Sequence, residues 1–198
     1  KLSDLYKLAM DSTRRNNEGV KPVMPIIKDF EKAKTNKDLL AMQMKYAKMG
    51  MQEFMYMGFG ADQRNAKNNI LNVYQGGIQL GEREYYLDND PATKAIREAY
   101  KKHIVRMFKI FGFNEKVATK KMNDIMKIET SLAKVSKSQT ELRDVEANYN
   151  KMTLKEFEAK YPNVPLVRLM QSLGVDSKDY QDMVVGQPSF VLGANKVI

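Results

Sequence analysis

Cysteine and tryptophan are absent from the sequence, and histidine occurs once, at His103. A chain without thiols forms no disulfide, no cysteine-ligated zinc or iron–sulfur centre and no thiol nucleophile. A single imidazole cannot supply the two ligands of a His-Glu-x-x-His zinc helix, and no Ser-His-Asp arrangement is indicated around it. We therefore expect no catalytic residue and no metal ligand in this chain, and the sequence leaves any substrate-binding residue unknown.

Long apolar runs are missing as well. None approaches the ~18 residues that a membrane span needs, so we expect no transmembrane segment. Residues 1–6 contain neither an initiator methionine nor the apolar core of a signal peptide. We expect the numbering to begin inside a longer natural chain, and Ile198 follows apolar-patterned residues as though a helix had been cut.

Acidic residues are fewer than basic ones, with 24 Asp and Glu against 33 Lys and Arg and a net charge of +9. Such an excess admits nucleic acid or an anionic membrane surface as a partner. The basic residues are interleaved with acidic and apolar ones along the sequence, which favours solvated helix faces and predicts no nucleic-acid partner. The hydrophobic fraction of 43% is close to that of globular proteins, about 45–50%, so we expect residues 1–198 to form one lobe.

Three amphipathic helices are predicted before residue 50. Apolar residues recur at helical spacing from Leu2 onward, in a helix that should end by Gly19 because glycine tolerates the backbone turn that stops a helix. Pro22 and Pro25 open a second helix. Asn36 is the predicted cap of a third.

The pattern changes near residue 51. Aromatic and methionine residues alternate from Met51 to Phe59, and a second alternating run, 69–74, follows the polar stretch 62–68. Alternation at period 2 is typical of strands, so a β-hairpin is predicted near residues 51–76. Four glycines are expected at its ends: Gly58, Gly60, Gly76 and Gly77. Because a lone hairpin is marginal in water, it should lie against helices or a neighbouring sheet.

A long antiparallel helix pair is predicted near residues 91–136. Asp90 and Pro91 favour a helix start, and Asn114 starts a second helix shortly after Gly112. Helices joined by so short a turn should pack antiparallel. The expected apolar stripes are Ile96, Tyr100, His103, Met107 and Phe111, widened by Ile104 and Phe108, on the first helix, and Val117, Met122, Ile125, Ile128 or Glu129, Leu132 and Val135 on the second.

Shorter elements are predicted after residue 150. Thr153 and Glu156 have the spacing of a capping box at a helix start. A further helix covers 165–173, a short extended piece covers 182–185, and the last helix begins at Pro188. The predicted fold class is mainly α, a multi-helix lobe with one small hairpin.

Several polar residues have both a functional and a structural interpretation. His103, in an apolar stripe, is interpreted as a packed, hydrogen-bonded core residue. The carboxylate pairs Glu82 with Glu84 and Asp88 with Asp90 are interpreted as turn and cap residues, although paired acids also serve glycoside chemistry when a cleft holds them.

Glu129 interrupts an apolar stripe, so we expect a buried acid paired with a Lys or Arg from a neighbouring helix. The glycine-rich stretches 58–60 and 76–77 lack the Lys and Ser or Thr of a phosphate loop and are interpreted as turns. The 14 methionines suit an adaptable core or a partner-facing surface, with the core as the default.

Five stretches, taken in order, resemble one known family. The most specific are Gly77 to Leu87 and Leu142-Arg143-Asp144 followed by Tyr149 to Thr153. The supporting stretches are Gly60-Ala61-Asp62, Glu129 to Lys134 and Val185 to Phe190. Over nearly its whole length the chain is similar to the N-terminal part of the neprilysin and endothelin-converting-enzyme family of zinc endopeptidases.

Departures from the family pattern refine the resemblance. Gly81 and Glu84 replace the usual Pro and Asp, and Ala9 stands where animal members carry a disulfide cysteine. The resemblance therefore implies a bacterial member.

The resemblance implies that the chain is one lobe of a two-lobed peptidase. In that family a mainly helical lobe faces a thermolysin-like lobe, encloses the active site and restricts entry to short peptides. The zinc-binding His-Glu-x-x-His, the third zinc ligand and the substrate-binding Asn-Ala-Tyr-Tyr segment lie downstream of the matched span. No catalytic, metal or substrate-binding residue is therefore carried over to this chain.

The implied partners are the downstream catalytic lobe and peptide substrates, and the implied cofactor is zinc in the full-length protein. The implied compartment is the periplasm or cell envelope. From the residues alone, a basic helical binding module for nucleic acid or a protein partner is the alternative.

Overall fold

The computed structural model describes residues 1–51 and 54–197, and within them the chain is mainly helical with one small sheet. The predicted mainly α fold class is confirmed. Gln52 and Glu53, in the predicted first strand, and the terminal Ile198 lie outside the described residues. In the described ranges, no helix is both long and apolar enough to cross a lipid bilayer.

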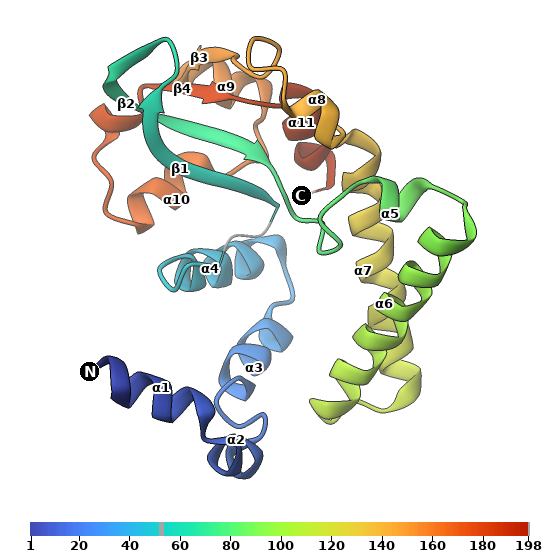
Figure 1. The fold of residues 1–198 in the computed structure, drawn as a ribbon. Coiled ribbons are helices and arrows are strands. Elements are labelled where there is room, and N and C mark those ends of the chain that lie inside the picture. Colours follow the sequence, from blue (N-terminus) through green and yellow to red (C-terminus); the bar gives the residue numbers. More distant parts are fainter. Residues whose placement is uncertain (52–53, 198) are drawn as a thin grey trace.

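The sheet has four strands in the order β1-β2-β4-β3 (Figure 1). Its strands are β1 (Met55–Asp62), β2 (Asn65–Gln75), β3 (Lys151–Thr153) and β4 (Asp182–Val185). The first two form the predicted hairpin, β4 runs parallel to β2, and β3 runs antiparallel to β4. The extended piece predicted at 182–185 is thus a central strand, and it supplies the neighbour that the hairpin requires.

The strands of the hairpin extend further towards the turn than predicted. The prediction of a polar connection over 62–68 is wrong, because β1 reaches Asp62 and β2 already begins at Asn65. Polar residues on this exposed end pair through their backbones, so the alternation of hydrophobic and polar residues gives no strand signal there. Two of the four predicted end glycines instead lie inside β1, while the other two follow β2: Gly58 and Gly60, and Gly76 and Gly77.

The main core lies between the sheet and the helices of the C-terminal part. The C-terminal elements are α8 (Gln139–Leu142), α9 (Leu154–Lys160), α10 (Leu166–Ser172), the 3-10 helix η1 (Ser177–Tyr180) and α11 (Pro188–Val197), and all except α8 contribute buried residues to this core. Leu71, Val73 and Val185 of the sheet are fully buried together with Phe157 and Phe190 of the helices. The predicted capping box at the start of α9 is confirmed.

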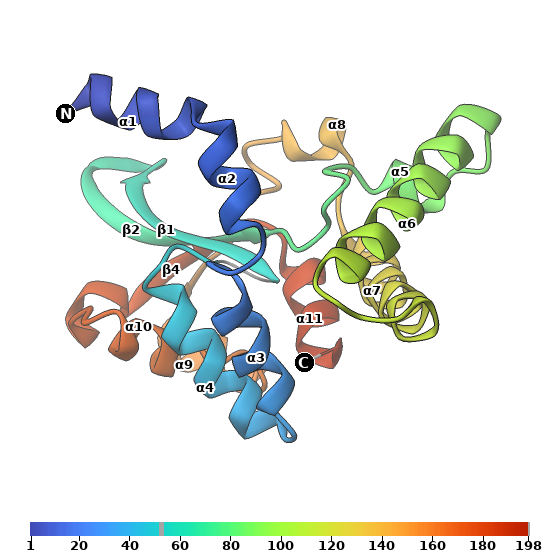
Figure 2. The ribbon, with the colours of Figure 1, turned by 90° about the horizontal axis from the view of Figure 1, so that it is seen from below.

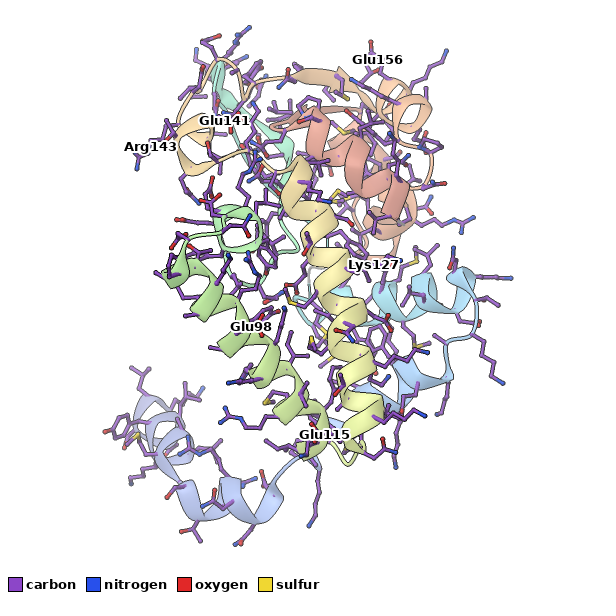
Figure 3. The ribbon with its side chains drawn as sticks, turned by 90° about the vertical axis from the view of Figure 1, so that its right-hand side faces the viewer. Glu98, Glu115, Lys127, Glu141, Arg143 and Glu156 are labelled. Carbon is purple, nitrogen blue, oxygen red and sulfur yellow. The ribbon has the colours of Figure 1, made fainter. Side chains whose placement is uncertain are left out.

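Two long helices, α6 (Pro91–Ile110) and α7 (Glu115–Val135), lie side by side and extend away from the sheet (Figures 1 and 3). Asp90 caps α6 and Asn114 caps α7, each accepting a backbone N–H at 3.0 Å. The short helix α5 (Glu84–Leu87) packs against both. The predicted helix pair is therefore confirmed.

The N-terminal helices are α1 (Leu2–Met10), α2 (Ser12–Glu18), α3 (Met24–Lys32) and α4 (Asn36–Ala47). The prediction of one helix up to Gly19 is wrong, because the helix is interrupted at Asp11. The Asp11 carboxylate accepts the N–H of Arg14 at 2.8 Å and caps α2. Every residue of α1 is exposed, and this helix lies at the edge of the molecule (Figure 2). Its apolar face is therefore not part of the core.

The cap of α4 lies one residue earlier than predicted. Thr35, and not Asn36, accepts the N–H of Asp38 at 3.2 Å, and the Asp38 carboxylate accepts the N–H of Thr35 at 3.0 Å. Thr35 and Asp38 thus form a capping box, which satisfies two otherwise unpaired amides.

Gly193 of α11 lies where this helix crosses α7. A Cβ built on Gly193 would be 2.5 Å from Cγ2 of Val135, whose β-branched side chain has little rotamer freedom. Helix propensity alone would make Gly193→Ala stabilising by about 1 kcal/mol. Because of the close contact we instead expect overpacking to lower the free energy of unfolding by about 1–3 kcal/mol, measured by urea denaturation.

Gly58→Ala is the matched control, since a Cβ at Gly58 meets nothing within 4 Å. Its free energy of unfolding should stay within about 0.5 kcal/mol of the wild type. If Gly193→Ala stabilised the protein, the close approach of α7 and α11 would be refuted.

Candidate functional site

A buried carboxylate joins the two long helices to α5. Glu129 of α7 is only 6% exposed. Its carboxylate accepts hydrogen bonds from the hydroxyls of Tyr86 at 2.6 Å and Tyr100 at 3.0 Å. The Tyr86 hydroxyl also accepts the N–H of Leu80 at 3.0 Å. Glu129 therefore holds three helices and the turn before α5 in one arrangement.

The electrostatics of this cluster follow from burial. Desolvation raises the pKa of Glu129 above its ordinary value, while the hydrogen bonds from Tyr86 and Tyr100 act in the opposite direction. Desolvation also raises the pKa of both tyrosine hydroxyls, and the adjacent carboxylate adds to this effect. Both hydroxyls therefore remain protonated and act as donors.

The predicted burial of Glu129 is confirmed, but the prediction of a Lys or Arg partner is wrong. Two neutral phenols occupy that place, and they satisfy the carboxylate without desolvating a second charge. A buried acid with a raised pKa is a candidate for catalysis. Here its oxygens are already bonded to groups of the chain's own core, so the arrangement supports a structural role.

The prediction that His103 is a packed core residue is wrong. His103 is exposed, and its Nδ1 lies 3.3 Å from Nη2 of Arg106. The inner face of α6 is formed by Tyr100, Ile104 and Phe108, which are four residues apart. Since neighbouring residues are about 100° apart around a helix, packing through Ile104 turns His103 towards solvent.

The predicted cap and turn carboxylates lie on the surface around α5 and α6. Asp90 caps α6 and Glu84 lies in the first turn of α5, as the structural interpretation predicts. Glu82 and Asp88 are exposed in the flanking turns. Across residues 1–51 and 54–197, no three His, Cys, Asp or Glu side chains form a group that could hold a metal ion. The donors present therefore do not fit the zinc that the resemblance implies for the full-length protein.

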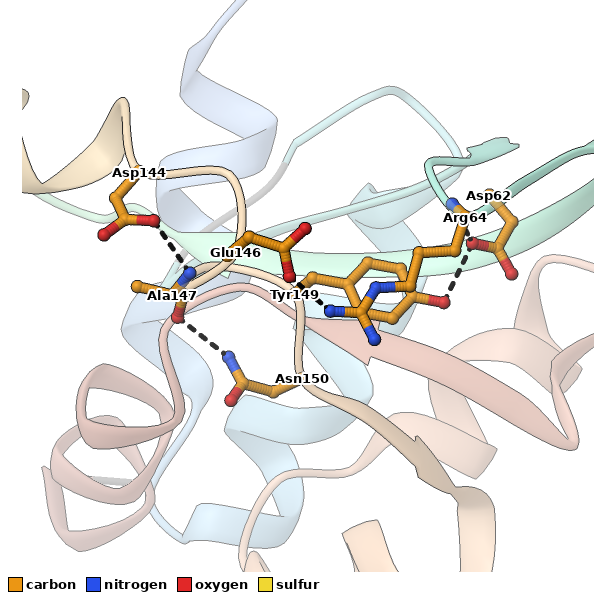
Figure 4. Close-up of polar contacts among 7 residues, drawn as sticks. All are labelled: Asp62, Arg64, Asp144, Glu146, Ala147, Tyr149 and Asn150. Carbon is orange, nitrogen blue, oxygen red and sulfur yellow. Dashed lines mark hydrogen bonds and ion pairs between the residues drawn. The ribbon is translucent and has the colours of Figure 1, made fainter.

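The turn of the hairpin and the stretch 142–153 meet in a polar cluster (Figure 4). The Tyr149 hydroxyl donates to Oδ1 of Asp62 at 2.9 Å. The guanidinium of Arg64 lies over the Tyr149 ring, 4.4 Å from its centroid, and forms an ion pair with Glu146. Two of the stretches that carry the family resemblance are thus in contact, and their polar groups fix the hairpin to the loop.

Three amides connect the sheet, the end of α7 and the start of α11; we call Gln75, Asn148 and Gln187 the amide network. Gln187, 2% exposed, accepts the N–H of Gln75 at 2.9 Å and donates to Oδ1 of Asn148 at 2.9 Å. The Gln75 side chain donates to the carbonyl of Lys137 at 2.9 Å and accepts its N–H at 2.8 Å. The sequence prediction missed this network, because Asn148 and Gln187 lie in loops and Gln75 ends a strand, and polar residues at such places carry no periodic signal.

An apolar pocket of about 140 Å³ lies between α4, β1 and α10. Five methionines contribute to its lining: Met44, Met51, Met55, Met57 and Met170. Met55 and Met170 belong to the core, as the default interpretation of the methionines predicts, whereas Met51 is exposed. The flexible thioether side chains suit the irregular shape of such a pocket.

The chain is similar to known peptidases in sequence. The family model described as Peptidase family M13 matches residues 1–198. Endothelin-converting enzyme 1 of Homo sapiens is 29% identical over 168 residues, which cover 80% of this chain and 21% of that protein. An endothelin-converting enzyme homolog of Locusta migratoria is 27% identical over 143 residues, covering 70% of this chain and 20% of that protein. The chain thus spans about a fifth of the length of the curated relatives it matches.

Solved structures share the fold. The zinc metalloprotease Zmp1 of Mycobacterium tuberculosis in its open state matches 98% of this chain and 30% of its own, with a TM-score of 0.87 and 24% identity. PepO from Lactobacillus rhamnosis matches 95% of this chain and 30% of its own, with a TM-score of 0.77 and 18% identity.

A pH series tests the buried state of Glu129. The folded protein holds the Glu129 proton more tightly than the unfolded chain, so wild-type stability should decline as pH rises from about 4.5 through the raised folded-state pKa. Glutamine does not titrate. The free energy of unfolding of Glu129→Gln, relative to wild type, should therefore increase across this interval, measured by urea denaturation between acidic and neutral pH.

For Glu98→Gln, the free energy of unfolding relative to wild type should instead decrease as pH rises. The hydrogen bond from Lys101 holds the pKa of Glu98 below its ordinary value, so the wild type gains stability as pH rises and this variant does not. A change of the same sign in both variants would contradict the assigned environment of Glu129.

Proposed function

The chain belongs to peptidase family M13, and from that premise we propose that residues 1–198 are a single non-catalytic lobe of a longer bacterial zinc endopeptidase. The observation that carries the proposal is the match of the family model to the whole chain, although the chain spans only about a fifth of its curated relatives. Residues 1–198 therefore correspond to one part of such a peptidase, about a fifth of the length of its relatives.

The donor set supports a catalytic centre on other polypeptide. A His-Glu-x-x-His helix binds zinc through two histidines, and this sequence has one, which is exposed on α6. In the proposed protein the downstream lobe holds zinc, which supplies an activated water for peptide hydrolysis. The partners of this chain are that lobe and the peptide substrates.

The contribution of this chain is to enclose the cleft and to limit the size of substrates. The contacts around Glu129, Tyr149 and Gln187 join distant segments, and such joined segments give a lobe that keeps its shape. A lobe of that kind excludes bulk solvent and large polypeptides from a reaction centre. We place the protein in the periplasm or cell envelope.

Peptide hydrolysis by the chain alone is the first test. Purified residues 1–198 should cleave a short fluorogenic peptide no faster than buffer does, with or without added zinc, because the metal ligands are missing. The same polypeptide extended past residue 198 should cleave the peptide, and a chelator should stop the cleavage. Chelator-sensitive turnover by residues 1–198 would contradict the proposal.

Size selection is tested on the extended protein. We expect it to cut a short peptide but to leave the same sequence uncut within a folded protein domain. Equal cleavage of both would refute the enclosing role while leaving the peptidase assignment intact.

A further inference from the structure

The positive charge of the chain gathers on its helix pair. Residues 91–135 contain eleven Lys and Arg against four Asp and Glu, a net charge of +7, and the rest of the chain contributes only +2 of the total +9. Most of the net charge therefore comes from this element, although 22 of the 33 basic residues lie elsewhere in the chain. Figures 1 and 3 show that this element projects away from the sheet, with Glu115 at its far end in Figure 3.

The charge is dense at the far end of the pair, residues 106–121, which we call the apex. It contains five basic residues and one acid, Glu115. Lys109 forms an ion pair with Glu115 at 2.5 Å, and Lys121 lies over the ring of Phe113 at 4.8 Å. The other three basic residues are exposed, with no acidic partner in the part of the chain that the structure describes: Arg106, Lys116 and Lys120.

Apolar side chains share the apex with these cations. Ile110 is 53% exposed and Val117 is 36% exposed. Phe111 and Phe113, on either side of Gly112, are partly exposed. On a membrane surface, apolar groups enter the boundary of the acyl chains while lysine side chains reach the anionic headgroups.

We propose that the apex docks on an anionic phospholipid surface. The three exposed cations without acidic partners supply charge complementarity to the headgroups, and each is worth about 1 kcal/mol near such a surface, or about a fivefold change in partitioning. Ile110 and Val117, the exposed apolar residues of the apex, enter the interface. This proposal does not depend on the peptidase function.

Nucleic acid fits the apex less well. Single strands stack their bases on open aromatic faces, whereas the Phe113 ring is covered by Lys121 and meets Phe108 edge to face at 5.7 Å. Phosphate contacts depend on charge and release of counterions, so the exposed Ile110 has no role in them. The apolar residues therefore distinguish the two partners.

Vesicle sedimentation tests the proposal. The protein should bind vesicles containing phosphatidylglycerol but not vesicles of phosphatidylcholine alone, and salt should weaken the binding. Lys116→Glu/Lys120→Glu should weaken it at least about 25-fold, since each lysine contributes about fivefold. Ile110→Ser should also weaken vesicle binding, but it should leave any binding to duplex DNA unchanged. Circular dichroism verifies that each variant is folded.

Lys67→Glu/Lys155→Glu is the matched control, because it changes the net charge equally at exposed positions on β2 and α9. It should bind phosphatidylglycerol vesicles as tightly as the wild type does, whereas the apex variants should bind more weakly. The proposal is overturned if the wild type fails to bind these vesicles at low salt, if the control loses binding equally, or if Ile110→Ser binds vesicles like the wild type. The last result, together with binding to duplex DNA, would assign the apex to nucleic acid.

Discussion

The amide network of Gln75, Asn148 and Gln187 is the interaction on which the arrangement of the chain depends. It lies where β2, the end of α7, the loop before β3 and the start of α11 meet, and these segments are as much as 112 residues apart. A buried amide left without a partner costs about 1–3 kcal/mol, so each member constrains the others. Most of the stretches that carry the family resemblance contain a residue of this network or of the Glu129 and Tyr149 contacts.

Local signals were sufficient to predict much of the fold. Asp90 and Asn114 satisfy the free amides at the starts of α6 and α7, and Thr153 does the same for α9. Caps are decided by residues three positions apart, so the sequence displays them directly. The helix pair and the hairpin followed from periodicity for the same reason. The family resemblance follows from short motifs that occur in the expected order along the chain.

The contacts between distant segments could not be predicted from the sequence. The sequence could not show that β4 inserts beside β2, because pairing of strands so distant leaves no local trace. Either His103 or Ile104 could lie at the centre of the apolar face of α6. In the structure Ile104 is packed in the core beside residues of α7, and His103 is exposed. The burial of Glu129 was predictable from its apolar neighbours, but its tyrosine partners come from α5 and α6 and depend on how those helices pack. No pattern in the sequence predicts the amide network.

A double-mutant cycle between Gln187 and Asn148 tests the central claim most directly. The free energies of unfolding of Gln187→Ala, Asn148→Ala and the double variant are measured by urea denaturation. If the two amides act as one buried unit, the double variant should lose at least about 1 kcal/mol less than the sum of the single losses. Losses that add within about 0.5 kcal/mol would mean that the two residues act independently, and the network would not be the constraint described.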